Sequence, residues 1–233
     1  MTTNLMTAPS PLFDAVLFDC DGVLVDSEPI THSVLRDVLE EAGWAMTLEE
    51  SMAIFLGKAV RDERAQIEAR TGKPLTDAWM RAFYARRDER LRTELQPMPG
   101  AVQAVAQVHA LVQGRIACAS GADRAKVLMQ LELAGMAQHF GERVFSGHDL
   151  PRSKPAPDVY LVAAQSVGVA PERCLVIEDT PTGVRAGLAA GATVWGYCPQ
   201  GHGRAFAGLP VARVFHHMAQ LPALLASVSS GHV

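Results

Sequence analysis

Two acidic side chains near the start of the chain have the type and spacing to carry chemistry. Asp19 and Asp21 lie two positions apart in the stretch LFDCDGVLVDSE, which covers residues 17–28. The apolar run 15–18 predicts a buried strand that Gly22 ends, so both carboxylates should lie where a strand opens into a loop. Carboxylates this close repel one another unless a cation or a proton lies between them. The stretch indicates a metal site, an acid/base pair or both; the alternative is a solvated turn.

Other reactive residue types also follow apolar runs. The run 115–119 ends in Ser120 and Gly121, and the run 174–177 ends in Glu178 and Asp179. Lys154 lies in a loop between two predicted strands. Because the carboxyl ends of parallel strands lie along one edge of a sheet, we expect these groups to converge on one crevice.

Strands that alternate with amphipathic helices predict an α/β fold with a parallel sheet flanked by helices. Shorter strands are expected at 144–146, 193–195 and 211–215. Strand signals are absent from residues 28–95, where Thr47 and Glu50 have capping-box spacing, so we predict an inserted all-helical cap domain. The predicted units are a flexible tail (1–11), a core (12–27 and 96–226) and the cap (28–95). Residues 227–233 lack a pattern and are expected to fray.

Composition excludes several classes of protein. The 233 residues are 48% hydrophobic and carry a formal net charge of −4, with acidic and basic residues interspersed. This is not the electrostatic footprint of a protein that binds nucleic acid or an anionic membrane. No apolar stretch approaches the ~18 residues of a membrane span, and the start lacks the pattern of a signal peptide. We expect a cytoplasmic protein whose four scattered cysteines are reduced.

The order and spacing of these motifs resemble the haloacid dehalogenase superfamily, and within it the subgroup of β-phosphoglucomutase and related sugar-phosphate phosphatases. The matching motifs are the D-x-D-G-x-L-x-D stretch from Asp19, Ser120 at a strand end, Lys154-Pro155, and Glu178-Asp179 followed by Gly183. The resemblance covers nearly the whole chain, including the cap. It implies a Rossmann-like core.

The resemblance also implies roles for the first group of residues. Asp19 would be the nucleophile that forms an aspartyl phosphate, and Asp21 would act as acid and base. A Mg²⁺ cofactor would be bound by Asp19, by the backbone carbonyl of Asp21 and by Asp179. Glu178 would be either a further ligand or an outer hydrogen-bond acceptor.

Donors that hold the phosphate follow in the same way. Ser120 and the Gly121 amide would bind the phosphoryl oxygens, and Lys154 would neutralise phosphate and nucleophile. In the cap, Lys58 could contact the distal end of a substrate; a solvent-exposed lysine is the alternative.

The expected partner is a small phosphorylated metabolite, bound by a monomer or a small homo-oligomer. Dehalogenases of the superfamily lack the equivalent of Asp21, which favours phosphoryl transfer. Mutases carry a His and an Arg where this chain has Thr31 and Val60; His32 and Arg61 lie one position away, a turn of about 100° on a helix. The prediction is a Mg²⁺-dependent phosphatase acting on a sugar phosphate, with 6-phosphogluconate as a suggestion. The alternatives are a phosphomutase and a non-catalytic sugar-phosphate sensor.

Overall fold

A six-stranded parallel sheet forms the centre of the molecule. The computed structural model describes residues 12–56, 58–199, 201 and 206–230, so the predicted tail at 1–11 lies outside the described residues. The strand order is β3-β2-β1-β4-β5-β6, and every pairing is parallel. The strands are β1 (Ala15–Phe18), β2 (Ile116–Ser120), β3 (Val144–Ser146), β4 (Cys174–Glu178), β5 (Thr193–Tyr197) and β6 (Arg213–Phe215). This confirms the predicted α/β fold, with β6 shorter than the expected 211–215.

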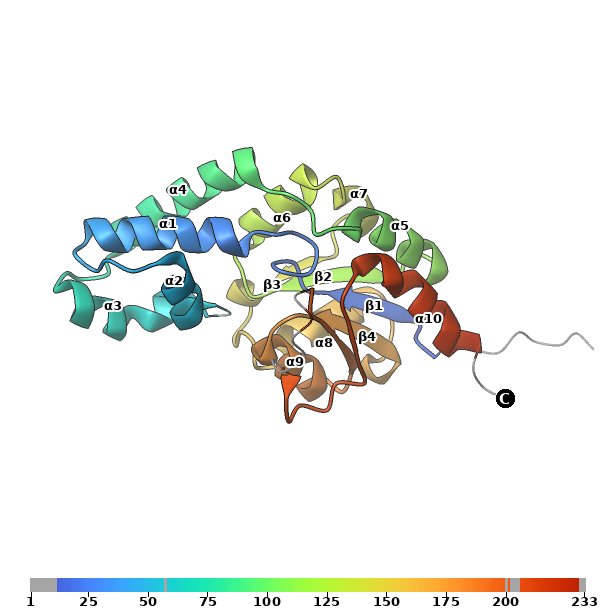
Figure 1. Cartoon of the computed structure of the whole chain (residues 1–233). Helices are drawn as coiled ribbons and strands as arrows, with labels where there is room; N and C mark the ends of the chain where they lie inside the picture. The colour runs from blue at the N-terminus through green and yellow to red at the C-terminus, as the bar shows by residue number, and fades with distance from the viewer. Residues whose placement is uncertain (1–11, 57, 200, 202–205, 231–233) are drawn as a thin grey trace, which may run out of the picture.

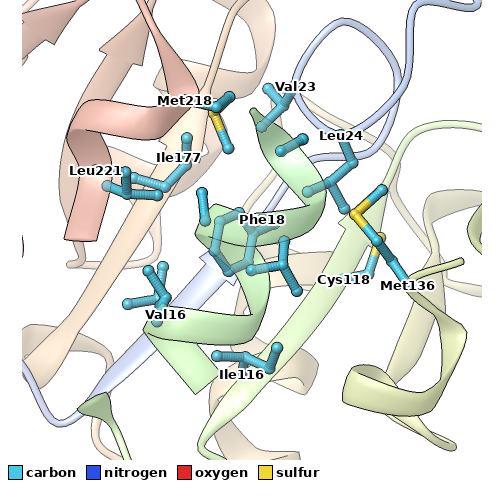
Figure 2. Close-up of a cluster of buried hydrophobic side chains, with 14 of the residues drawn as sticks. Val16, Phe18, Val23, Leu24, Ile116, Cys118, Met136, Ile177, Met218 and Leu221 are labelled. Carbon is cyan, nitrogen blue, oxygen red and sulfur yellow. The ribbon is translucent and has the colours of Figure 1, made fainter. Parts of the chain in front are cut away.

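The central strands are apolar because both faces of the sheet are covered. Every residue of β1, β2 and β4 is buried. Along β1, Val16 and Phe18 belong to one hydrophobic cluster, while Ala15 and Leu17 belong to the cluster on the opposite face. Figure 2 shows Phe18 at the centre of the first cluster.

Helices cover the two faces of the sheet (Figure 1). One face is covered by α5 (Ala101–Leu111), α6 (Arg124–Leu133), α7 (Ala137–Phe140) and α10 (Leu221–Ser230), and the other by α8 (Asp158–Ser166) and α9 (Pro181–Ala189). The expectation that residues 227–233 fray is wrong for 227–230, which complete α10, and 231–233 lie outside the described residues. Leu221 and Leu225 lie one turn apart and are buried in the first cluster, so packing stabilises a helix whose last turn carries no strong pattern.

Within 28–95, the regular elements that the structure describes are all helical. They are α1 (Glu28–Glu41), α2 (Leu48–Phe55), a 3-10 helix (Val60–Glu63), α3 (Arg64–Thr71) and α4 (Asp77–Glu94). The expected capping box is present: the Thr47 hydroxyl accepts the Glu50 amide, and the Glu50 carboxylate accepts the Thr47 amide. These helices share a hydrophobic cluster of their own, which includes Leu35, Phe55 and Phe83. We refer to residues 28–95 as the helical insert; in Figure 1 it lies to one side of the sheet.

Two adjacent chain segments connect the insert to the sheet. The Asp26 amide donates to the Gln96 carbonyl at 2.9 Å, and the Met98 amide donates to the Leu24 carbonyl at 2.9 Å. No helix that the structure describes is long and apolar enough to cross a membrane.

Candidate active site

A cavity of about 340 Å³ lies between the carboxyl ends of the strands and the helical insert. Seven of the eight predicted site residues line it: Asp19, Asp21, Lys58, Ser120, Gly121, Lys154 and Glu178. The eighth, Asp179, follows Glu178 directly after β4. The fold therefore brings these groups together from three strand ends, the loop that carries Lys154, and the insert.

Asp19 is the first residue after β1 and is 7% exposed. Its Oδ1 accepts a hydrogen bond of 2.7 Å from Lys154 Nζ. Burial raises the pKa of Asp19 to about 7, and the neighbouring carboxylates of Glu178 and Asp21 also raise it, against the attraction of Lys154. The environment thus disfavours the charged form of Asp19 unless further positive charge is supplied.

Lys154 joins two carboxylates that line the cavity with it. Its Nζ donates to Asp19 Oδ1 and to Glu178 Oε1, both at 2.7 Å. It also lies 4.7 Å from the ring centroid of Tyr160. Burial by itself would lower the pKa of Lys154, but Asp19 and Glu178 outweigh it and raise that pKa well above its usual range. Lys154 is a fixed positive charge next to the predicted nucleophile.

Glu178 is fully buried, and both of its carboxylate oxygens accept hydrogen bonds. Oε1 accepts from Lys154 at 2.7 Å and from the Tyr160 hydroxyl at 2.9 Å. Oε2 accepts the amides of Asp179 and Thr180 and the Thr180 hydroxyl at 3.0 to 3.1 Å. A Cβ on Gly183 would lie 1.6 Å from Oε1, so only glycine leaves room for this carboxylate. These bonds account for the direction in which Glu178 points.

Asp179 contrasts with Glu178 because its Oδ1 is buried without a hydrogen-bond partner among the described residues. Burial raises the pKa of Asp179 well above its usual value, and the Glu178 and Asp19 carboxylates raise it further. One oxygen from each of these three residues lies within 4.8 Å of the others. Oxygen ligands and an unpartnered buried carboxylate are what a hard divalent cation requires, so the residues fit Mg²⁺.

The turn at Gly22 brings the backbone after Asp21 close to the Asp179 side chain. Gly22 has φ +77°, and a Cβ there would lie 2.1 Å from Asp179 Oδ2. Glycine is therefore needed both for the backbone conformation and for the approach of Asp179.

Asp21 has partners that sequence reasoning missed. Its Oδ1 accepts hydrogen bonds from Lys126 Nζ at 2.8 Å, from Gln130 Nε2 at 2.9 Å and from the Ser27 hydroxyl. Burial acts to raise the pKa of Asp21, but the Lys126 charge and these hydrogen bonds outweigh it and lower the pKa to about 2. Lys126 and Gln130 are spaced one helical turn apart, next to the buried Val127 and Leu131. Polar residues at core-facing helix positions were the available signal.

The predicted phosphate donors lie at the end of β2. Ser120 is 1% exposed, and its Oγ accepts the Ala122 amide at 3.0 Å, which leaves the hydroxyl proton free to point elsewhere. Gly121 has open space where a side chain would stand. A phosphoryl group could approach both donors.

The helical insert lines the other side of the cavity. Thr31, Val60 and Lys58 line it, and so does His32, which the sequence had placed off that face; Arg61 does not. His32 is 2% exposed, and its Nε2 lies 2.9 Å from the Glu28 carboxylate, one helical turn earlier. The first turns of α1 border the cavity over an arc wide enough to include both positions.

Comparison with known proteins agrees with this geometry. Residues 13–191 match the family model of haloacid dehalogenase-like hydrolases. The chain belongs to this family. Its membership confirms the resemblance, and the chain is an enzyme of the hydrolase class, with curated relatives that are phosphatases.

Two relatives and one solved structure illustrate the match. The chain is 29% identical to 6-phosphogluconate phosphatase of Escherichia coli over 91% of this chain and 94% of that one. It is 32% identical to hexitol phosphatase A of Escherichia coli over 76% and 80%. A haloacid dehalogenase family hydrolase from Deinococcus radiodurans, solved with bound phosphate and sodium, superposes with a TM-score of 0.75 at 36% identity, over 96% of this chain and 98% of that one.

Proposed function

We propose that this haloacid dehalogenase-like hydrolase is a Mg²⁺-dependent phosphatase that hydrolyses a small sugar phosphate through an aspartyl phosphate on Asp19. The observation that carries the proposal is the pairing of buried Asp19 with Lys154 at 2.7 Å, beside the unpartnered Oδ1 of Asp179. A nucleophilic carboxylate, a fixed cation and a free oxygen ligand then meet at one edge of the sheet.

The first half of the reaction uses Asp19 and Asp21. A carboxylate oxygen of Asp19 forms a bond to phosphorus while the bond between phosphorus and the ester oxygen of the sugar breaks, and protonated Asp21 gives its proton to that leaving oxygen. The negative charge of the bound phosphate favours this protonated form, against the low pKa that Lys126 and its neighbours impose on Asp21. In the second half, water attacks the aspartyl phosphate, Asp21 takes the proton of that water, and inorganic phosphate leaves Asp19. Ser120, the Gly121 amide and Lys154 hold the charged phosphoryl oxygens.

The proposed Mg²⁺ ligands are the carboxylates of Asp19 and Asp179 and the backbone carbonyl of Asp21. When bound, Mg²⁺ supplies positive charge that favours ionised Asp19 and neutralises phosphoryl oxygens. For Glu178, we propose the role of hydrogen-bond acceptor rather than ligand, because both of its oxygens already accept bonds from protein donors. Glu178 would thus position Lys154 and the chain at Asp179.

Charge balance favours the phosphatase over the phosphomutase alternative. A phosphomutase must hold a bisphosphate, which requires cations for a second phosphate. Each Lys or Arg that lines the cavity within the described ranges already contacts a carboxylate of this chain. These pairs are Lys58 with Glu63, Arg87 with Asp88 and Asp123, Lys126 with Asp21, and Lys154 with Asp19 and Glu178. The helical insert would then act as a cap that selects a substrate with one phosphate. The intact pair of Asp19 and Asp21 argues against the other alternative, a non-catalytic sensor.

A panel of sugar monophosphates tests the proposal. It should include hexitol phosphates, fructose 1-phosphate and 6-phosphogluconate, with free phosphate and isomerised sugar phosphate measured in parallel. We expect free phosphate and no isomer. Isomer without net phosphate release would establish the mutase, and binding without either product would establish the sensor. Cytoplasmic location, and assembly as a monomer or a small homo-oligomer, stay predictions.

A further inference from the structure

Among the residues that the structure describes, hydrogen bonds hold Asp21 through only one of its two carboxylate oxygens. Oδ1 accepts hydrogen bonds from Lys126, Gln130 and Ser27. No described residue bonds Oδ2, and this atom is not among the buried unpartnered ones. Since Asp21 lines the cavity, Oδ2 is the oxygen that a solute there can reach.

The helix that supplies two of these donors is well suited to keep them in place. Lys126 is 5% exposed and Gln130 is fully buried, on the same face of α6. The Gln130 side chain is oriented by its other end, because Oε1 lies 3.5 Å from the Cys20 thiol. An ammonium group can only donate, so Lys126 fixes Oδ1 as an acceptor.

We propose that Lys126 is a positioning residue for Asp21, which holds Oδ1 so that Oδ2 is the atom that exchanges protons with the leaving oxygen and with water. This inference rests on the proposed phosphatase function. It assigns to Lys126 no contact with the phosphoryl group; that contact belongs to Lys154, which donates to Asp19 Oδ1.

The two half-reactions depend on this arrangement to different degrees. Breakdown of the aspartyl phosphate needs Oδ2 to take a proton as the water oxygen bonds to phosphorus and the bond from Asp19 breaks. Formation of the aspartyl phosphate needs a proton from Oδ2 only when the leaving oxygen is a poor leaving group, as in a sugar. p-Nitrophenolate leaves without one. Loss of Lys126 should therefore slow breakdown while sparing formation from p-nitrophenyl phosphate.

The test is rapid mixing of Lys126→Met with p-nitrophenyl phosphate. We expect a burst of p-nitrophenolate close to one per active site, followed by a steady rate lowered about 10- to 100-fold, within the range that acid/base catalysis contributes. On the best sugar phosphate, both phases should slow, and KM should not rise. If Lys126 had a merely structural role, its loss would lower the rate of the burst and the steady rate by the same factor with both substrates.

Three further variants keep the test decisive. Lys126→Arg retains a cationic donor and should recover part of the steady rate. Gln130→Met removes a second donor to the same Oδ1, so it should keep the burst and lower the steady rate by a smaller factor than Lys126→Met does. If Lys126→Met does not fold, the Gln130→Met measurement decides the question. Arg124→Met is the control on the same helix: its guanidinium donates to the Val144 carbonyl at 3.1 Å, so the ratio of the two phases should match wild type.

Wild-type steady rates in both Lys126→Met and Gln130→Met would overturn the inference, as would equal loss of both phases. The proposed function is judged separately, by phosphate release from the sugar-phosphate panel by wild type and Arg124→Met. If neither protein releases phosphate, the proposed function is wrong and the inference about Lys126 is wrong with it. If both release phosphate, the burst measurement tests the role of Lys126 separately.

Discussion

Arg87 of α4 and Asp123 at the N-cap of α6 connect the helical insert to helix α6 of the core through an ion pair of 3.1 Å. The Arg87 side chain is 6% exposed, and its guanidinium also contacts Asp88 at 2.7 Å and lies 4.6 Å from the Tyr84 ring centroid. The other oxygen of Asp123 accepts the Lys126 amide at 2.9 Å. One carboxylate thus links the insert to the helix that holds Asp21.

Asp123→Asn should weaken this link without removing the helix cap, because asparagine caps a helix about as well as aspartate. We expect the free energy of unfolding to fall by about 0.5 to 1 kcal/mol at pH 7, since Asp123 is partly exposed. Burial acts to raise the pKa of Asp123, but the Lys126 amide and Arg87 outweigh it and keep that pKa below its ordinary value of 3.8. The stability that the Asp123 charge contributes is therefore complete at pH values above the ordinary pKa of 3.8, and it is lost as pH falls through the lower pKa of Asp123 in the folded protein.

Thermal melts of wild type and Asp123→Asn at pH 7 and near pH 3 measure the effect. The difference in Tm should be present at pH 7 and should shrink at the lower pH. An equal difference at both values would show that the charge of Asp123 is not what stabilises the contact.

Asp19→Asn tests the nucleophile. The amide keeps the shape of the side chain but cannot form the aspartyl phosphate, so turnover should fall about 10³-fold or more while the melting curve stays cooperative. Asp26→Asn is the matched control, because Asp26 is exposed in the same loop and should keep most activity. Residual activity of Asp19→Asn within tenfold of wild type would sink the covalent mechanism.

Metal dependence has a readout in stability as well as in activity. A chelator should abolish turnover and added Mg²⁺ should restore it. Mg²⁺ at about 100 times its Kd should also stabilise the fold by about 2.7 kcal/mol, measured as a rise in Tm against NaCl of equal ionic strength.

Asp179→Asn sharpens the metal test. Without Mg²⁺, this variant should be at least as stable as wild type, because it replaces a buried carboxylate oxygen that lacks a partner. It should also lose the rise in Tm that Mg²⁺ causes. A metal-free Asp179→Asn that is much less stable, yet responds to Mg²⁺ like wild type, would remove Asp179 from the metal site.

Lys58 tests the insert as the source of substrate preference. It lines the cavity, its side chain is 48% exposed, and its Nζ lies 3.5 Å from Glu63. Lys58→Ala should raise KM for the best sugar phosphate and leave p-nitrophenyl phosphate nearly unaffected, since remote contacts bind substrate without joining the transfer.

Lys73→Ala is the control for Lys58, because Lys73 is an exposed lysine of the same insert outside the cavity lining. Equal losses on both substrates would place Lys58 in folding or in the chemistry at the sheet. No loss of activity on either substrate would show that Lys58 is a solvent-exposed lysine without a role in substrate binding.

The amino-acid sequence alone determined which edge of the sheet carries the candidate site. Strands buried on both faces read as continuous apolar runs, and parallel strands must end at one edge, so Asp19, Ser120 and Glu178 could be placed together before any coordinates. Local rules also sufficed at Thr47, where the capping box depends on residues three apart. Apolar strand runs and capping boxes depend on the backbone geometry of residues that are close in sequence, and this geometry is the same in every protein.

Only the tertiary structure decided which side chains complete the site. Lys126 reaches Asp21 across 105 positions of sequence, Arg87 reaches Asp123 from the insert, and Tyr160 bonds Glu178 from α8. Each contact depends on how a helix is rotated and how deeply it packs against its neighbour, and helical periodicity gives a face but not the partner of that face. His32 borders the cavity for the same reason: the width of the opening beside α1 is set by packing between elements, not by residues near His32 in sequence.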